Sequence, residues 1–356
     1  MLIKMQVGEQ DRGELQVNVT DSDNAPIRDA RVTISEPETA INPNSPIERL
    51  ETDVSGQTQI VDLNTPPLEY SLNENNENMP YANYNIQIEV PGYETENIRN
   101  VEILPDSLSL QNVRMRKREG EQVENIDIDP HTLYAEYPEK IPEDEIKDVN
   151  EPGEIVLSRV VIPEYVVVHD GTPSSNARDY YVTYKDYIKN VASSEIYATW
   201  PRATIEANVL AIMSFTLNRV YTEWYRNKGY DFTITSSTAY DQKWIYGRNI
   251  FQSIDEVVDE IFDQYLSRPD VRQPILTQYC DGKRVTCPNW LSQWGSCNLG
   301  EQGFGTLEII RNYYGDDMYI NTAEQISGIP ASWPGYDLTI GASGQKVMQM
   351  QEQLDT

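Results

Sequence analysis

Short segments in which apolar and polar residues alternate dominate the first third of the chain. They cover residues 13–19, 30–34, 52–60, 84–90 and 111–117, and the residues between them are rich in Asn, Asp, Pro and Gly. Alternation with a period of two is typical of strands that bury one face, and short strands between such turns indicate an antiparallel sandwich. We therefore predict an N-terminal β-sandwich domain over residues 1–117.

The next segment, residues 118–156, is rich in acidic residues and proline and lacks apolar periodicity. Such a segment cannot bury enough surface to offset the entropy lost on ordering it. We therefore expect an extended or mobile acidic linker. Because exposed linkers are preferred sites of proteolysis, it is a candidate processing region. A plain solvated tether is the alternative.

A β-prone apolar run over residues 157–171 opens the second half of the chain, and a helical pattern follows it. Apolar residues recur there at steps of three and four: Ile205, Val209, Ile212, Met213, Leu217 and Val220. This spacing predicts a long amphipathic helix with one buried face. Pro201 suits its first turn, and Thr199 is the predicted N-cap. Glu195 lies just before this helix, among small and apolar residues.

Two shorter helices are expected further on, over residues 253–268 and 306–314. Ser253 caps the first and Pro269 stops it, whereas Gly315 ends the second. The glycines between them predict a loop; they are Gly295, Gly300, Gly303 and Gly305. These elements indicate a mixed α+β domain over residues 157–325, so the fold class that we expect is multidomain α+β.

The charge of the chain limits its partners. Its 356 residues include 28 basic and 57 acidic side chains, which gives a net charge of -29. Such a chain cannot neutralise phosphates over a long footprint, so we expect neither nucleic acid nor an anionic membrane surface as a partner. No apolar run is long enough to predict a transmembrane helix. The first residues lack the apolar region of a signal peptide, so export would use another route or a leader has been removed.

Histidine chemistry is nearly excluded by composition. The only two histidines are His131 and His169, and both precede Glu195. A Ser-His-Asp triad needs a histidine base, and a hydrolytic zinc site usually takes at least one histidine ligand. We therefore expect catalysis to depend on carboxylates, with His169 as a hydrogen-bonded turn residue. The three cysteines, Cys280, Cys287 and Cys297, allow one disulfide and one thiol, three thiols, or a three-thiolate metal site.

The order of motifs in the first hundred residues resembles the carboxypeptidase-regulatory-like, or prealbumin-like, domain. The residues that carry the resemblance are Leu15-x-Val17-x-Val19, Pro26-Ile27, Ala30-x-Val32, Thr52-Asp53-x-x-Gly56 and Val90-Pro91-Gly92-Tyr93. The resemblance implies either a binding domain or pro-domain, or a structural spacer.

Two motifs about ninety residues apart resemble the SpoIID/LytB family. The first is Tyr187-Ile188, Val191, Glu195 and Trp200-Pro201; the second is Leu291-Ser292-Gln293-Trp294-Gly295-Ser296, followed by Leu307, Ile309-Ile310 and Tyr313-Tyr314-Gly315. The match spans about residues 180–320. The family implies cleavage of peptidoglycan by lytic transglycosylation, with Glu195 as the sole acid and base. Ser292, Gln293, Tyr314 and Asn208 would then contact the sugar or the peptide.

Some features depart from that family. Ile196-Tyr197 stands where Met-Pro often follows the glutamate, and Met213 stands where an arginine is usual. Some members bind zinc through a histidine and two cysteines, but residues 240–246 of the corresponding loop contain neither. We therefore predict no zinc, no other metal and no cofactor.

The domain order is more particular than the family. Residues 336–356 resemble the start of a peptidoglycan-binding module, carried by Gly341, Gly344, Val347 and Gln351. A β-domain, an acidic linker, a SpoIID-like domain and such a module together resemble the clostridial spore cortex-lytic enzymes. That resemblance implies a zymogen outside the cytoplasm, in the spore cortex, the coat region or the cell wall. Its partners would be peptidoglycan glycan strands and a protease that cuts the linker at germination.

Two other functions remain open. A non-catalytic wall-binding or amidase-enhancer protein would keep the same fold, and a wall-degrading part of a phage-tail-like device would explain the missing signal peptide. Glu195 could also be a buried structural carboxylate. The other acids near the helix, Glu206 and Glu223, are expected at its surface.

Overall fold

The computed structural model describes residues 11–40, 44–118, 123–147, 157 and 159–330. The predicted wall-binding motif at residues 336–356 lies outside these residues. The chain forms two compact units of mixed α+β structure. The sandwich unit comprises Met1–Glu136, Ser193–Trp200 and Ile245–Glu256; the helical unit comprises Tyr137–Ala192, Pro201–Trp244 and Val257–Thr356. The sandwich unit therefore draws residues from both sides of the predicted linker, whereas the helical unit begins within it.

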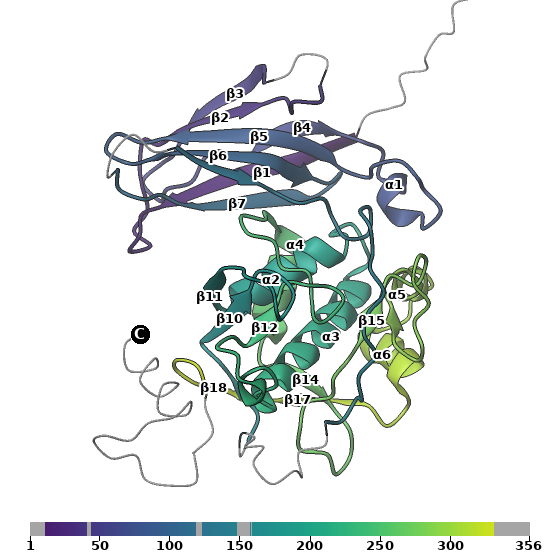
Figure 1. The fold of residues 1–356 in the computed structure, drawn as a ribbon. Helices are drawn as coiled ribbons and strands as arrows, with labels where there is room; N and C mark the ends of the chain where they lie inside the picture. The colour runs from purple at the N-terminus through teal and green to yellow at the C-terminus, as the bar shows by residue number, and fades with distance from the viewer. Residues whose placement is uncertain (1–10, 41–43, 119–122, 148–156, 158, 331–356) are drawn as a thin grey trace, which may run out of the picture. The chain divides into compact units, whose positions relative to one another are not determined.

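Two sheets build the sandwich unit (Figure 1). One has the strand order β3-β2-β5-β6-β8 and the other β13-β7-β1-β4. Pairing is mostly antiparallel, as expected, but β1 pairs with β7 and β6 with β8 in parallel, so the predicted all-antiparallel pattern is wrong in detail. The elements are β1 (Asp11–Thr20), β2 (Arg31–Ser35), β3 (Pro46–Glu51), β4 (Val61–Thr65), α1 (Glu69–Leu72), β5 (Ala82–Glu89), β6 (Thr95–Ile103), β7 (Leu108–Arg114), β8 (Val123–Asp127) and β13 (Ile250–Phe251).

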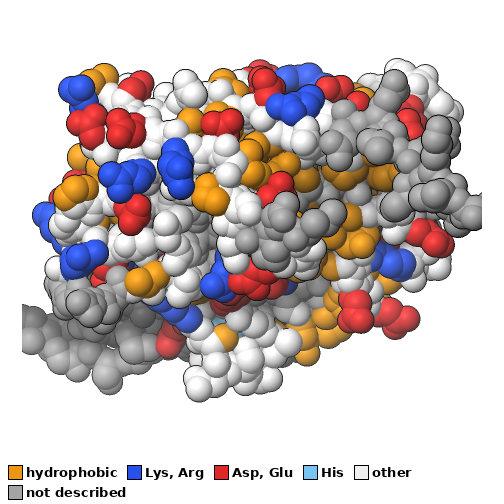
Figure 2. All heavy atoms as spheres, turned by 90° about the horizontal axis from the view of Figure 1, so that it is seen from above, with side chains coloured by type: hydrophobic (Ala, Val, Ile, Leu, Met, Phe, Trp, Pro, Cys, Tyr) orange, Lys and Arg blue, Asp and Glu red, His pale blue; other side chains and the backbone are white. Residues whose placement is uncertain are grey.

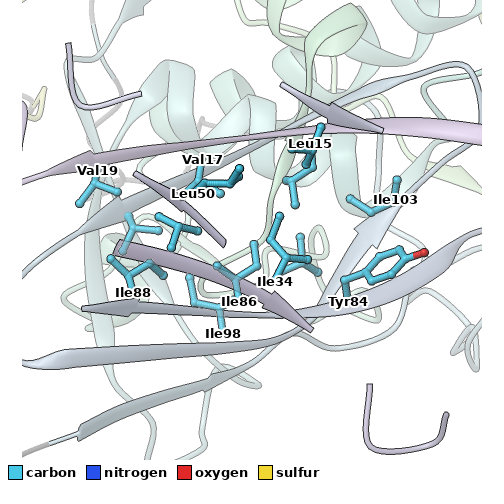
Figure 3. Packing of buried hydrophobic residues seen from close by; sticks show 14 of the residues in the cluster. Leu15, Val17, Val19, Ile34, Leu50, Tyr84, Ile86, Ile88, Ile98 and Ile103 are labelled. Carbon is cyan, nitrogen blue, oxygen red and sulfur yellow. The ribbon is translucent and has the colours of Figure 1, made fainter. Parts of the chain in front are cut away.

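Aliphatic side chains from both sheets form the core of the sandwich unit. Figure 3 shows Leu15, Val17 and Val19 of β1 with Ile86 and Ile88 of β5, and all five are buried. They occupy alternate positions because successive side chains of a strand point to opposite faces. Burial of each such side chain stabilises the fold by about 1.5–3 kcal/mol.

The strand predictions hold where alternation and burial coincide. Those for residues 13–19, 30–34 and 84–90 are confirmed by β1, β2 and β5. The strand predicted over residues 52–60 is wrong. The Asp53 carboxylate accepts the N–H groups of Ser55 and Gln57, which closes a turn. Gly56 has φ +73°, and a Cβ there would lie 2.4 Å from the Val19 carbonyl oxygen, so this position favours glycine.

A segment from far along the chain completes the sandwich unit. Strand β13 pairs with β7, with Ile250 opposite Leu110. The Arg248 guanidinium donates to the buried Glu102 carboxylate at 2.7 Å, and the Asn249 side chain bonds the backbone of Glu102. The contacts that order this segment therefore come from residues about 150 positions earlier.

The segment predicted as a linker is ordered where it is described. Residues 123–127 form β8, and His131 and Thr132 are buried in the sandwich unit. Residues 137–147, which we call the strap, belong to the helical unit. This corrects the expectation of a solvated tether.

Charged side chains hold the strap, which explains why hydrophobic periodicity did not reveal it. Lys140 and Lys147 are buried, whereas Ile141 and Ile146 are 44% and 41% exposed. The Lys140 ammonium donates to the Asp241 carbonyl oxygen at 3.0 Å. The strap is therefore an electrostatic attachment rather than a core strand.

Helix α3 (Arg202–Tyr221) runs through the helical unit (Figure 1) and is buried on all sides from Ala207 to Tyr221. The predicted apolar face is buried, but so are the polar residues opposite it, so the helix is not amphipathic. The hydroxyl groups of Ser214 and Thr216 donate hydrogen bonds to the carbonyl oxygens four residues earlier in the helix. Gln242 donates to the Ile212 carbonyl oxygen and accepts from Thr216.

Two of the remaining predictions differ from the structure, and one is confirmed. Helix α4 (Gln252–Ile261) stops seven residues early, because Gln264–Ser267 forms β14 and pairs with β17. The predicted glycine loop is mostly helix α5 (Gln293–Glu301). Helix α6 (Thr306–Tyr314) is confirmed, with Gly315 after it at φ +97°. The other elements are β9 (Val161–Ile162), β10 (Tyr165–His169), β11 (Asp179–Thr183), α2 (Tyr184–Glu195), η1 (Arg226–Lys228), β12 (Ile234–Thr235), β15 (Tyr279–Cys280), β16 (Leu291–Ser292), β17 (Tyr319–Thr322) and β18 (Glu324–Gln325).

An ion network ties the strap to helix α3. Arg219 is buried and donates to the Asp241 carboxylate at 2.7 Å and to the Glu143 carboxylate at 2.5 Å. Lys147 also pairs with Glu143. Asp241 further accepts from the Tyr225 hydroxyl and from Thr235. A buried guanidinium needs such partners, because an unpaired buried charge is costly.

We expect Asp241→Asn to destabilise the protein by about 3 kcal/mol or more, the cost typical of breaking a buried ion pair. Arg202→Gln is the control, because Arg202 lies on the same helix but is 51% exposed in its pair with Glu206. Its cost should stay below about 1 kcal/mol. Urea denaturation measures both, and equal losses would contradict the structural role of the Arg219 network.

A pH effect is expected from Glu96, which lies opposite Glu124 in the parallel pair β6 and β8. Burial, and then the Glu124 carboxylate, raise the pKa of Glu96 from 4.5 to about 7. The folded state keeps this proton where the unfolded state has lost it, so stability falls as pH rises from about 4.5 to about 7.

Glu96→Gln should therefore raise the melting temperature at pH 8 and leave it nearly unchanged at pH 4. The gain in unfolding free energy at pH 8 should be up to about 1 kcal/mol, the order of one like-charge contact between strands. Glu89→Gln, at an exposed position paired with Arg31, is the control and should show no such pH dependence. A gain at pH 4 as large as that at pH 8 would rule out the titration of Glu96 as the cause.

Candidate active site

Glu195 is the last residue of helix α2 and has no solvent exposure. It belongs to the Ser193–Trp200 segment of the sandwich unit. The chain then turns, with the Trp200 N–H group donating to the Tyr197 carbonyl oxygen, before α3 begins. The end of one helix thus fixes the carboxylate in a buried position.

The backbone on both sides of Glu195 bonds to two consecutive residues from the predicted linker. The Thr132 N–H group donates to the Ser194 carbonyl oxygen at 3.0 Å. The His131 Nε2 atom lies 3.3 Å from the Ile196 carbonyl oxygen, and His131 Nδ1 accepts the Leu133 N–H group. Nδ1 is therefore the unprotonated nitrogen, and Nε2 donates to Ile196.

Aromatic rings line the same segment. The His131 and Tyr197 rings lie 4.5 Å apart, and the Tyr197 and Trp200 rings meet edge to face at 5.8 Å. The Trp200 indole N–H donates to the Ser71 carbonyl oxygen at 2.9 Å. Thr199 donates to the Ser71 hydroxyl, so its predicted N-cap role is wrong; Pro201 is the N-cap of α3.

The four predicted substrate contacts lie in the helical unit, where Asn208 of α3 bonds to the first turn of α5, the helix that Ser292 caps and Gln293 begins. The Ser292 hydroxyl accepts the Gly295 N–H group and caps α5. Asn208 donates to the Ser296 hydroxyl at 2.9 Å, and Ser296 donates to the Gln293 carbonyl oxygen at 2.6 Å. The bond from Asn208 to Ser296 therefore joins the two helices.

Tyr314 is placed apart from this junction. Its hydroxyl donates to the Gln278 carbonyl oxygen at 2.8 Å, and burial raises the pKa of Tyr314 above its usual range.

The Gln293 side chain is buried and accepts from the Tyr137 hydroxyl of the strap at 3.4 Å. A residue of the predicted linker thus covers one predicted substrate contact.

Other predicted residues have structural surroundings. His169 is buried, and its Nδ1 atom lies 2.7 Å from the Asp179 carboxylate. Its ring stacks on the Phe232 ring, in agreement with a structural role. Glu206 is half-buried and accepts from Arg202. Glu223 is only 3% exposed, so the predicted surface position is wrong for it.

Cys280 and Cys287 form a disulfide, and Cys297 is a buried thiol outside that bond. This pairing rules out the three-thiolate site, because two of its sulfurs are bonded to each other. Among the residues that the structure describes, no group of three or more His, Cys, Asp or Glu could hold a metal ion.

His131, Thr132 and Tyr137 are the residues near the site that the sequence did not indicate. They come from an acidic, proline-rich segment, and their partners Ser194, Ile196 and Gln293 lie 62 or more positions away. The only signal was the rarity of histidine in the chain.

The face of the molecule drawn in Figure 2 carries charged side chains of both signs. Figure 2 shows Lys and Arg side chains interspersed with Asp and Glu side chains there, rather than gathered in one patch. Within the described part of the chain, no helix combines the length and apolar character needed to cross a membrane.

Comparison with protein families and with curated proteins finds no match. Solved structures similar to part of the chain include the minor pilin GBS52 of Streptococcus agalactiae, with 16% identity and a TM-score of 0.22 over 32% of this chain and 48% of that one. A catechol 1,2-dioxygenase of Acinetobacter radioresistens shows 14% identity and a TM-score of 0.23 over 33% of this chain and 58% of that one. The chain thus matches about half of the length of each. Likeness at this level identifies neither fold nor function.

Asn208→Ala tests whether that side chain joins helices. We expect a loss of about 1–3 kcal/mol in unfolding free energy, because the Ser296 hydroxyl and the Thr204 carbonyl oxygen would each lose the Asn208 amide group as a donor. Gln302→Ala removes an exposed amide at the end of α5 and should cost under about 0.5 kcal/mol. Thermal and urea unfolding measure both. Unchanged stability of the Asn208 variant would favour a contact with substrate instead.

Proposed function

We propose that the chain is the precursor of a peptidoglycan lytic transglycosylase of the SpoIID-like class, with Glu195 as its acid and base. The observation that carries the proposal is the position of Glu195: a carboxyl group without solvent exposure at the end of α2, in the segment that also carries the paired rings of Tyr197 and Trp200. A general acid must hold its proton until the reaction, and burial favours the neutral form of a carboxyl group.

The chemistry needs one carboxyl group. Glu195 protonates the oxygen of the β-1,4 bond between N-acetylmuramic acid and N-acetylglucosamine, and the bond from that oxygen to the anomeric carbon breaks. The 6-hydroxyl group of the same muramic acid then attacks the anomeric carbon and gives its proton to the Glu195 carboxylate. The product ends in a 1,6-anhydro ring, and no water is consumed. A second carboxylate, which hydrolytic glycosidases use, is not required.

The setting follows from the sequence resemblances. The substrate would be peptidoglycan of the spore cortex or wall, and the protein would act outside the cytoplasm. A protease would cut the precursor near the end of the acidic segment at germination. The prealbumin-like identity of the sandwich unit and the SpoIID-like identity of the other domain belong to the same proposal.

Glu195→Gln tests the assignment. In protein cut within residues 148–156, this variant should lose muropeptide release by at least about 100-fold, the contribution of one general acid. It should unfold at nearly the same temperature as the wild type. Glu206→Gln is the matched control, because Glu206 is a half-buried glutamate paired with Arg202 on α3, and it should retain activity. Full activity of the Glu195 variant would overturn the assignment.

A non-catalytic wall-binding protein is the second candidate. It is favoured by the protein partners already held by Ser292, Asn208 and Tyr314. Cut wild-type protein that sediments with insoluble peptidoglycan, but releases no fragments from it, would support this alternative.

A further inference from the structure

We infer that His131 and Thr132 form an inhibitory clamp on the Glu195 segment in the uncut chain. The inference rests on the proposed function for its meaning, but the clamp itself is defined by contacts within the sandwich unit. These two residues bond the carbonyl groups immediately before and immediately after Glu195.

The clamp supplies hydrogen-bond donors to carbonyl groups at the end of helix α2. The last carbonyl groups of a helix have no partner within the helix, and Ser194 is the penultimate residue of α2. The Thr132 N–H group provides a donor to that carbonyl, and the His131 imidazole provides one to Ile196. Ser194, Glu195 and Ile196 are all fully buried, and these bonds join the backbone on both sides of Glu195 to the turn at His131 and Thr132.

The sandwich unit fixes the clamp in place. The His131 N–H group donates to the Tyr81 hydroxyl at 3.2 Å. Tyr81 also packs edge to face against Tyr134, with ring centres 6.0 Å apart. The N–H groups of Tyr134 and Ala135 both donate to the His131 carbonyl oxygen, which makes residue 132 the first position of a helical turn. His131 and Thr132 thus have a defined geometry.

The position of the clamp in the chain suits regulation. Residues 131–132 lie before the candidate processing region, and Glu195 lies after it. A cut between them would make the clamp part of a separate chain, so that its withdrawal could open the Glu195 segment without breaking the catalytic chain.

The test uses the full uncut chain. His131→Ala with Thr132→Pro removes both donors, and proline is tolerated at the first position of a helical turn. Tyr134→Phe is the matched control, because it changes the same turn, keeps the ring that packs on Tyr81 and leaves both bonds to the Glu195 segment. Circular dichroism and melting curves establish that each variant is folded.

Two readouts separate the clamp from the activity. The first is the rate at which a carbodiimide couples an amine to the Glu195 carboxyl group, followed by mass spectrometry; the second is muropeptide release. We expect labelling of Glu195 in the double variant to be at least about tenfold faster than in the wild type, the factor that one net hydrogen bond represents. The control should match the wild type.

The outcomes are distinct. Faster labelling with release of muropeptides supports both the clamp and the transglycosylase. Faster labelling without release supports the clamp and contradicts the proposed function. A folded double variant that labels like the wild type overturns the clamp. If the double variant does not fold, hydrogen exchange of the wild type decides: the Thr132 amide must be protected in the uncut chain, and exchange at the rate of an open loop overturns the clamp.

Discussion

The Glu195 side chain ends helix α2 without contact with water, so the carbonyl groups at that helix end need protein donors. Thr132 and His131 supply them from a part of the chain that lies before the candidate cut. The sandwich unit therefore includes the Ser193–Trp200 segment, and the indole of Trp200 bonds to Ser71. Residues from the first part of the chain thus surround the segment that carries this buried carboxyl group.

A second buried charge organises the helical unit in the same way. The Arg219 guanidinium on α3 needs the carboxylates of Asp241 and Glu143. Glu143 lies in the strap, whose Tyr137 reaches the Gln293 side chain. Lys140 and Lys147 of the strap are buried whereas Ile141 and Ile146 are exposed, so ion pairs and hydrogen bonds contribute much of its attachment. Attachments of this kind are sensitive to the removal of a single partner.

The sequence predicts the parts of the fold that depend on local pattern. The alternation of apolar and polar residues predicted β1, β2 and β5, and the glycine after Tyr314 predicted the end of α6. The errors occur where distant residues decide. Residues 264–267 pair with β17 instead of extending α4, and the Ile250–Phe251 strand forms only because β7 offers an edge.

The candidate site shows the same division. The spacing of the motifs identified Glu195 as the candidate catalytic residue. It also identified Ser292, Gln293 and Asn208, which lie where α3 meets the start of α5. It could not select His131 and Thr132, because a lone histidine in an acidic segment has no local pattern and its partner is 65 residues away. Nor could it show that Tyr314 bonds to a backbone carbonyl outside that junction.

The mass of the sugar at the newly formed glycan end tests the central claim most directly. Protein cut in the acidic segment, incubated with purified cortex peptidoglycan, should produce muramic acid ends that are lighter by one water than hydrolysed ends, because the 6-hydroxyl group closes an anhydro ring. Reducing muramic acid ends of full mass would show that water is the nucleophile, and the account of Glu195 as the single acid and base would then be wrong.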